Sequence, residues 1–151
     1  MKKINLNTMF VSVLGIGFIP IASGTFGSLA GLVIGYFLNL LSYNLFFLFI
    51  PTLFILGVIA SNTYQKVTGE KDSSVIVIDE VVGQLIAMMF VMDNIVLVFI
   101  SFIIFRIFDI LKPWPASYAD KKMSDGFGVM LDDVFAGIYA AILVCLIGSI
   151  I

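Results

Sequence analysis

Long apolar runs separated by short polar segments dominate the pattern of this 151-residue chain. A helix needs about 20 mostly apolar residues to cross a bilayer, because each residue adds only about 1.5 Å to its length. Five runs approach that length: 24–41, 45–64, 75–92, 95–111 and 131–151. We therefore predict an all-α integral membrane helical bundle of about five spanning helices, formed as a single domain over residues 1–151.

The N-terminal apolar segment, residues 8–19, is shorter and contains Gly15 and Gly17. About a dozen residues are too few to span a bilayer, so we expect this segment to be interfacial or re-entrant. No small-residue cleavage site follows it, and we interpret it as part of the protein rather than as a signal peptide.

The connections between the runs predict the orientation of the chain. Segments 42–44 and 93–94 are short enough for tight turns, whereas 65–74 and 112–130 are long and hold most of the charge. With the N-terminus on the side of the long connections, all basic residues share that side: Lys2, Lys3, Lys66, Lys71, Arg106, Lys112, Lys121 and Lys122. The positive-inside rule makes this side cytoplasmic. We expect a multi-pass protein of the inner (plasma) membrane.

Within the first run, Gly27, Gly31 and Gly35 recur every four residues. Residues at this spacing share one helix face, and small residues there let a neighbouring helix approach closely. We interpret this stripe as a packing surface.

Composition excludes several kinds of chemistry. Hydrophobic residues make up 61% of the chain and charged residues 12%, about half the charged share of a soluble domain. There is no histidine, which excludes histidine phosphatases, His-ligated zinc and Ser-His triads. The single cysteine, Cys145, lies in an apolar run and is expected to serve packing.

Charged side chains converge at the predicted cytoplasmic boundary, where the third run starts, the fourth ends and the fifth starts. Seven of them are candidate catalytic residues: Asp79, Glu80, Arg106, Asp109, Lys112, Asp132 and Asp133. Arg106 and Lys112 cannot neutralise five carboxylates, and unpaired charge in a low-dielectric layer is costly. Oxygen ligands without imidazole or thiolate favour Mg²⁺. The alternative is structural: a helix N-terminus stabilised by Asp132 and Asp133, with an Arg106–Asp109 ion pair.

A second element precedes the first run at the same boundary. Its glycines and hydroxyls, Gly24, Thr25, Gly27 and Ser28, are candidates for binding a phosphate through backbone N–H groups. An ordinary helix N-cap by Thr25 or Ser28 is equally compatible with the pattern. Trp114, between two prolines, is expected to anchor the chain at interface depth.

Three segments of the chain resemble the bacterial phosphatidylglycerophosphatase A family: Gly24–Ser28, Asp72 with Ile76–Gly83, and Phe105–Pro115 with Asp125–Gly137. The similarity extends over nearly the whole chain. The Arg-Asp-Lys-Pro-Trp segment combined with paired aspartates is its most specific part. Ser23 is a departure, since the family commonly has proline there.

The resemblance implies Mg²⁺-dependent hydrolysis of phosphatidylglycerophosphate to phosphatidylglycerol and inorganic phosphate in glycerophospholipid biosynthesis. Asp79, Glu80, Asp109, Asp132 and Asp133 would hold one or more Mg²⁺ ions, while Arg106 and Lys112 would neutralise the phosphoryl oxygens. Both direct water attack and an aspartyl-phosphate on Asp79 or Asp132 stay open, as do oligomeric state and activity on other lipid phosphates.

Residues outside this set receive weaker assignments. Asp72 and Asp125 are second-rank site candidates, whereas Glu70, Lys71, Asp120, Lys121 and Lys122 are expected on a solvated or headgroup-facing surface. The expected partners are the lipid substrate and the bilayer, with no nucleic acid.

Two rival functions differ from the phosphatase in the patterns they require. A membrane ion channel or transporter needs polar groups at several depths, but here the charges gather at one level. A CDP-alcohol phosphotransferase-like lipid enzyme would show a longer Asp-Gly-x-x-Ala-Arg pattern, but Asp125-Gly126 continues as Phe-Gly-Val-Met.

Overall fold

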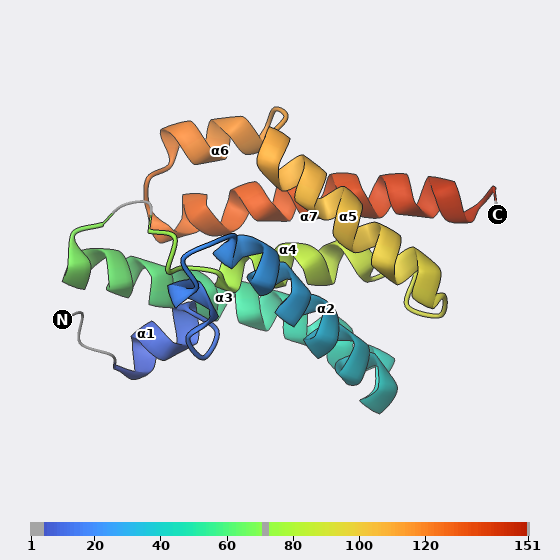
Figure 1. The fold of residues 1–151 in the computed structure, drawn as a ribbon, viewed down its shortest axis with the longest axis horizontal. Helices are drawn as coiled ribbons and strands as arrows, with labels where there is room; N and C mark the ends of the chain where they lie inside the picture. Colours follow the sequence, from blue (N-terminus) through green and yellow to red (C-terminus); the bar gives the residue numbers. More distant parts are fainter. Residues whose placement is uncertain (1–4, 71–72, 151) are drawn as a thin grey trace.

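The computed structural model describes residues 5–70 and 73–150, and this part of the chain is helical apart from turns and short extended segments. Figure 1 shows an elongated bundle in which α1 and the C-terminal end of α7 lie near opposite ends. The helices follow in the order α1 (Leu6–Val11), η1 (Ile16–Phe18), α2 (Ser23–Leu41), α3 (Tyr43–Thr68), α4 (Ile78–Met88), α5 (Ile95–Leu111), α6 (Ala116–Lys122) and α7 (Gly126–Gly148). The predicted all-α fold is confirmed.

Among the described residues, three helices are long and apolar enough to cross a membrane: α2, α3 and α7. The 17 residues of α5 extend over about 26 Å, slightly less than the roughly 30 Å of a bilayer's hydrocarbon core. The 11 residues of α4 extend over only about 16 Å. The helix in the predicted 75–92 run is therefore much shorter than expected.

The short helix α4 occupies the centre of the bundle, where it packs mainly on α7 and α2. Its apolar run continues outside the helix, because residues 75–77 are buried but not helical. The Val77 N–H donates to the Val11 carbonyl at 2.9 Å, and Gly17 lies against the Val75 backbone. Irregular backbone is tolerated in a membrane protein where the protein itself encloses it. The N-terminal segment, with only the short helices α1 and η1, supplies this enclosure.

The predicted glycine stripe of α2 is confirmed as a packing surface against α4. A Cβ atom on Gly31 would lie 2.9 Å from the Val81 carbonyl oxygen, and one on Gly35 would meet the side chains of Leu85 and Met88. The absence of side chains lets the two helix axes approach closely.

Helix α7 begins five residues before the predicted start of its run. Asp125 is its N-cap, and the Asp125 Oδ1 atom accepts a hydrogen bond from the Gly128 N–H at 3.0 Å. Residues 125–128 therefore form a capped first helical turn. Asp132 and Asp133 consequently lie in the second turn of α7 rather than at its start.

The connection 112–130 also contains α6, which the apolar pattern does not predict. Ala116 and Ala119 are buried where α6 packs on α7. The Tyr139 hydroxyl of α7 donates to the Trp114 carbonyl at 2.7 Å and fixes the start of this segment.

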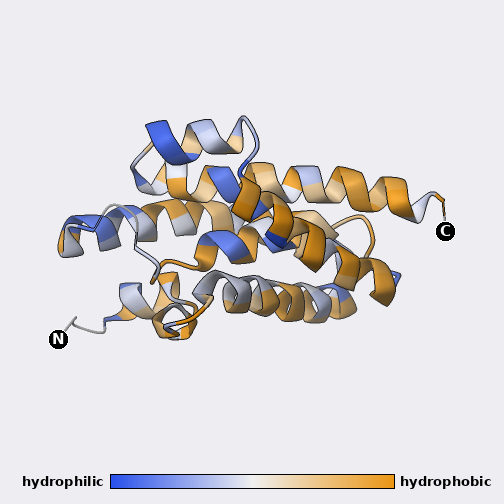
Figure 2. Ribbon diagram, turned by 45° about the horizontal axis from the view of Figure 1, so that its top comes forward, coloured by the Kyte–Doolittle hydropathy of each residue, from blue (hydrophilic) through white to orange (hydrophobic). Residues whose placement is uncertain are grey.

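Polar residues gather at one end of the bundle. In Figure 2, hydrophilic segments cluster around α6, the C-terminal part of α3 and the start of α4, while the opposite end is largely hydrophobic. The Gly126 N–H donates to Asn62 Oδ1 at 2.8 Å, which joins α3 to the start of α7 at the polar end. Asp93 lies beside Gly148, near the C-terminal end of α7. Lys2, Lys3, Lys71 and Asp72 lie outside the described residues.

Candidate active site

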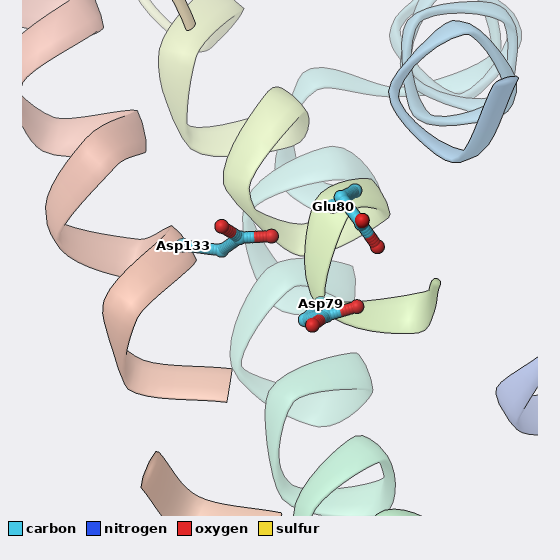
Figure 3. Close-up of side chains that lie close together, drawn as sticks. All are labelled: Asp79, Glu80 and Asp133. Atoms are coloured by element: carbon cyan, nitrogen blue, oxygen red, sulfur yellow. The ribbon is translucent and has the colours of Figure 1, made fainter. Parts of the chain in front are cut away.

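Three carboxylates meet between α4 and α7. Asp79 and Glu80 lie in the first turn of α4, and Asp133 lies in α7. One carboxylate oxygen from each residue lies within 4.8 Å of the other two. Figure 3 shows the Asp133 side chain directed from its helix toward the other two. This spacing allows three oxygens to contact one cation.

Close packing of α4 against α5 and α7 determines how the three carboxylates are placed. A Cβ atom on Gly83 would lie 2.5 Å from the Phe105 ring and 2.8 Å from the Asp133 carbonyl oxygen, so a side chain there would separate α4 from α5 and α7. Gly137 lies against the Gly83 carbonyl in the same way. The positive end of the α4 dipole also favours the two carboxylates in its first turn.

The three carboxylates lack sufficient compensation from the protein. Asp79 Oδ1 and Glu80 Oε2 are buried without a hydrogen-bond partner among the described residues. No ion pair within 4.0 Å is found for Asp79, Glu80 or Asp133 in the described part of the chain. Buried charge of this kind requires protons or a cation. The acidic group therefore fits a divalent metal ion.

Arg106 and Asp109 form an ion pair on one face of α5, as their spacing predicts. The Arg106 Nη1 atom also donates to the Ser28 hydroxyl of α2 at 3.3 Å. The Arg106 Nε atom is buried and has no partner among the described residues. The guanidinium is thus held by α5 and α2, and its buried Nε–H donor is unused.

Lys112 ends α5 and bridges two further helices. Its Nζ atom lies 2.5 Å from Asp120 Oδ1 on α6 and 2.7 Å from Asp132 Oδ2 on α7. Burial lowers the pKa of the Lys112 ammonium, but the hydrogen bonds and charges of the two carboxylates outweigh burial and raise the pKa above its ordinary value. Lys112 therefore carries a positive charge at neutral pH.

A cavity of about 190 Å³ joins these groups. Its lining consists of Ser73, Ser74, Ile76, Asp79, Glu80, Asp109, Lys112, Asp120, Met123, Ser124, Val129, Asp132 and Asp133. Six of the seven predicted catalytic residues are among them, and Arg106 lies behind the lining. A cavity of this size accommodates a phosphoryl group. Its lining provides the positive charge of Lys112 together with several carboxylates.

The predicted phosphate-binding segment lies beside the cavity but does not line it. Its residues form the first turns of α2, whose N-cap is Ala22, so the alternative of a cap by Thr25 or Ser28 is wrong. A Cβ atom on Gly24 would collide with the Glu80 carboxylate, and Gly27 lies against Val77. Through Gly24 the segment lies against the acidic group. Through the Ser28 hydroxyl it accepts a hydrogen bond from Arg106.

Sequence reasoning missed Asp120, which the structure places beside Lys112 in the cavity lining. The available signal was Pro115, because proline is common before or at the first turn of a helix and could have indicated α6. Ser23 also gains a role, since its hydroxyl donates to the Ser74 carbonyl at 3.0 Å and joins α2 to the cavity wall.

Comparison with known proteins agrees with this chemistry. The sequence profile of Phosphatidylglycerophosphatase A matches residues 9–148. The chain belongs to the phosphatidylglycerophosphatase A family. It is 40% identical over 149 residues to the Haemophilus influenzae protein named Phosphatidylglycerophosphatase A, in an alignment that covers 95% of this chain and 91% of that protein.

Other members of the wider group carry related names. The Escherichia coli Phosphatidylglycerophosphatase A is 36% identical over 135 residues, covering 89% of this chain and 78% of that protein. A Bacteroides thetaiotaomicron protein, provisionally named a phosphatidylinositol-3-phosphatase, is 39% identical over 141 residues, covering 86% of each chain. No solved structure matches the chain significantly.

Proposed function

We propose that this protein hydrolyses phosphatidylglycerophosphate to phosphatidylglycerol and inorganic phosphate. Family membership supports the reaction. The observation that connects it to particular residues is the group of Asp79, Glu80 and Asp133, which lies in the cavity with Lys112 and has no basic ion-pair partner among the described residues. The name that the two relatives share indicates the lipid substrate. The acidic and basic residues of the cavity explain how a phosphoryl group could be transferred there.

The metal that fits best is Mg²⁺, because the candidate ligands are all carboxylate oxygens. Asp79, Glu80 and Asp133 would hold it, with Asp109 and Asp132 as the remaining predicted ligands. When bound, Mg²⁺ would polarise the phosphoryl group and lower the pKa of an attacking water.

The protein's own cations would then act on the phosphoryl oxygens. Lys112 lines the cavity with two of its three donors occupied, so its third can stabilise charge that develops during transfer. Arg106 orients Asp109 and is itself fixed by Ser28. For a covalent route, Asp79 is the better nucleophile, since both oxygens of Asp132 already accept hydrogen bonds from Lys112 and the Asp133 N–H.

The orientation proposed for this site is cytoplasmic, in the inner membrane. The basic residues Lys66, Lys112, Lys121 and Lys122 occupy the helix ends around the cavity, and the positive-inside rule assigns such an end to the cytoplasm. The substrate would reach the cavity from the cytoplasmic leaflet.

Phosphate release from phosphatidylglycerophosphate in detergent, with Mg²⁺ or with a chelator, tests the proposal. We expect release by the wild type only with Mg²⁺, and a loss of roughly a hundredfold or more in Asp79→Asn, which keeps the side-chain size but removes the charge. Asp93→Asn is the matched control, because Asp93 is an exposed carboxylate at the other end of the bundle.

Two outcomes would contradict the proposal. Equal activity of Asp79→Asn and wild type would exclude Asp79 from the reaction. A wild type that releases no phosphate from this lipid would refute the assigned substrate, and parallel assays with phosphatidic acid and phosphatidylinositol 3-phosphate would then identify the headgroup it accepts.

A further inference from the structure

The ammonium group of Lys112 lies between carboxylates from two other helices, Asp120 of α6 and Asp132 of α7. A lysine side chain has many rotamers, so its partners determine where the charge stays. Both carboxylates can accept from one ammonium group, which leaves a single N–H donor for another acceptor. The direction of that last donor depends on both partners.

The two partners differ in exposure. The Asp132 side chain is 8% exposed, whereas that of Asp120 is 34% exposed. Ion pairs between such exposed groups contribute little to folding stability. The contact between Asp120 and Lys112 therefore adds little to the stability of the fold. Because Asp120 lines the cavity, a role in the reaction explains the contact better.

The support of α6 gives Asp120 a defined position. Ala116 and Ala119 are buried against α7, and Gly128 of α7 lies against the Met123 backbone that follows α6. A Cβ on Gly128 would overlap the Met123 carbonyl, so this approach depends on glycine. The carboxylate of Asp120 is therefore attached to a helix packed closely on the helix that carries Asp132 and Asp133.

We propose that Asp120 is a positioning residue that holds the Lys112 charge at the cavity wall. Without Asp120, the ammonium would be free to move toward the carboxylates of Asp79, Glu80 and Asp133 and would compete there with a divalent cation. With Asp120 present, Lys112 keeps one donor for a phosphoryl oxygen. The catalytic consequence rests on the proposed function, whereas the positioning itself does not.

Kinetics of Asp120→Ala provide the first test. We expect kcat for phosphate release to fall roughly 10- to 100-fold with a smaller change in KM, as is usual when a supporting contact to a reacting group is lost. Asp120→Asn should recover part of the loss, because its amide oxygen still accepts a hydrogen bond. Lys121→Ala, at the next position of α6, is the matched control and should retain wild-type kcat.

A double-mutant cycle separates action through Lys112 from independent action. In a Lys112→Ala background, adding Asp120→Ala should cause no further loss of kcat. Multiplicative losses would show that Asp120 acts on its own, and a wild-type kcat in Asp120→Ala would equally overturn the proposal.

A spectroscopic measurement decides the positioning without reference to activity. In protein labelled with ¹⁵N-lysine, the Lys112 ammonium signal, assigned by its loss in Lys112→Ala, should exchange slowly with solvent in the wild type and rapidly in Asp120→Ala. An unchanged signal in Asp120→Ala, or no protected signal in the wild type, would refute the proposal. A wild type inactive on the lipid would refute the proposed function alone.

Discussion

Gly24 illustrates how a residue outside the cavity lining can still control the site. A Cβ atom at this position would collide with the Glu80 carboxylate and lie 3.3 Å from Arg106 Nη1. The glycine therefore lets the start of α2 contact an acidic and a basic group at once. The sequence predicts Gly24 as part of a phosphate-binding turn, and the structure adds a direct contact with the acidic group.

Substituting Gly24 should therefore impair the reaction more than folding. In Gly24→Ala the Glu80 carboxylate must shift, and displacement of a reacting group by about 1 Å can cost on the order of a hundredfold in rate. Gly35→Ala, on the same helix, is the control, because its Cβ would meet the flexible ends of Leu85 and Met88. We expect a large loss of kcat only in Gly24→Ala. Equal kcat in both variants would contradict the proposed importance of the Glu80 position.

At the scale of helices, the apolar pattern predicts well where burial and helix coincide. The run 95–111 matches α5, and 24–41 matches α2 to one residue. The run 75–92 exceeds α4 at both ends, because hydropathy does not distinguish helix from other buried backbone, and residues 75–77, 91 and 92 are buried without being helical. The seven residues of α6 carry too mixed an apolar pattern to be recognised by hydropathy. Pro115 could have indicated where this helix begins, but not the contact between Lys112 and Asp120. The convergence of the other charged residues could be predicted, because helices that alternate in direction bring the start of α4, the end of α5 and the start of α7 to the same end of the bundle.

The tight packing around α4 predicts a stability effect at Gly83. In Gly83→Ala the new methyl group would meet the Phe105 ring and the Asp133 carbonyl, and neither can move without displacing a helix. Overpacking of this kind destabilises by about 1–3 kcal/mol. Thermal unfolding in detergent should show a lower Tm than wild type, and Gly148→Ala, whose Cβ would meet only the Leu97 side chain, should unfold near the wild-type temperature. A wild-type Tm for Gly83→Ala would contradict the packing described.

For the whole molecule, the separation of its polar and apolar ends constrains its placement in the membrane. The cavity, α6 and the described basic residues lie at one end, whereas Asp93 lies at the other, near the C-terminal end of α7. Because basic segments are retained on the cytoplasmic side, the two ends should differ in access from outside the cell. An enzyme whose acidic cavity lies at one end requires only this orientation, whereas a transporter would require access from both ends.

Cysteine labelling in intact cells measures this orientation. In a Cys145→Ser background, a membrane-impermeant maleimide should label Asp93→Cys in spheroplasts, because the exposed 93–94 turn faces outward in the proposed topology. Lys121→Cys should be labelled only after the membrane is permeabilised, since α6 would face the cytoplasm in the same proposed topology. Both sites are exposed in the fold, so a difference between them reports the membrane and not burial. Labelling of Lys121→Cys in intact spheroplasts would contradict the cytoplasmic site, and the lipid substrate would then have to be supplied from the outer leaflet.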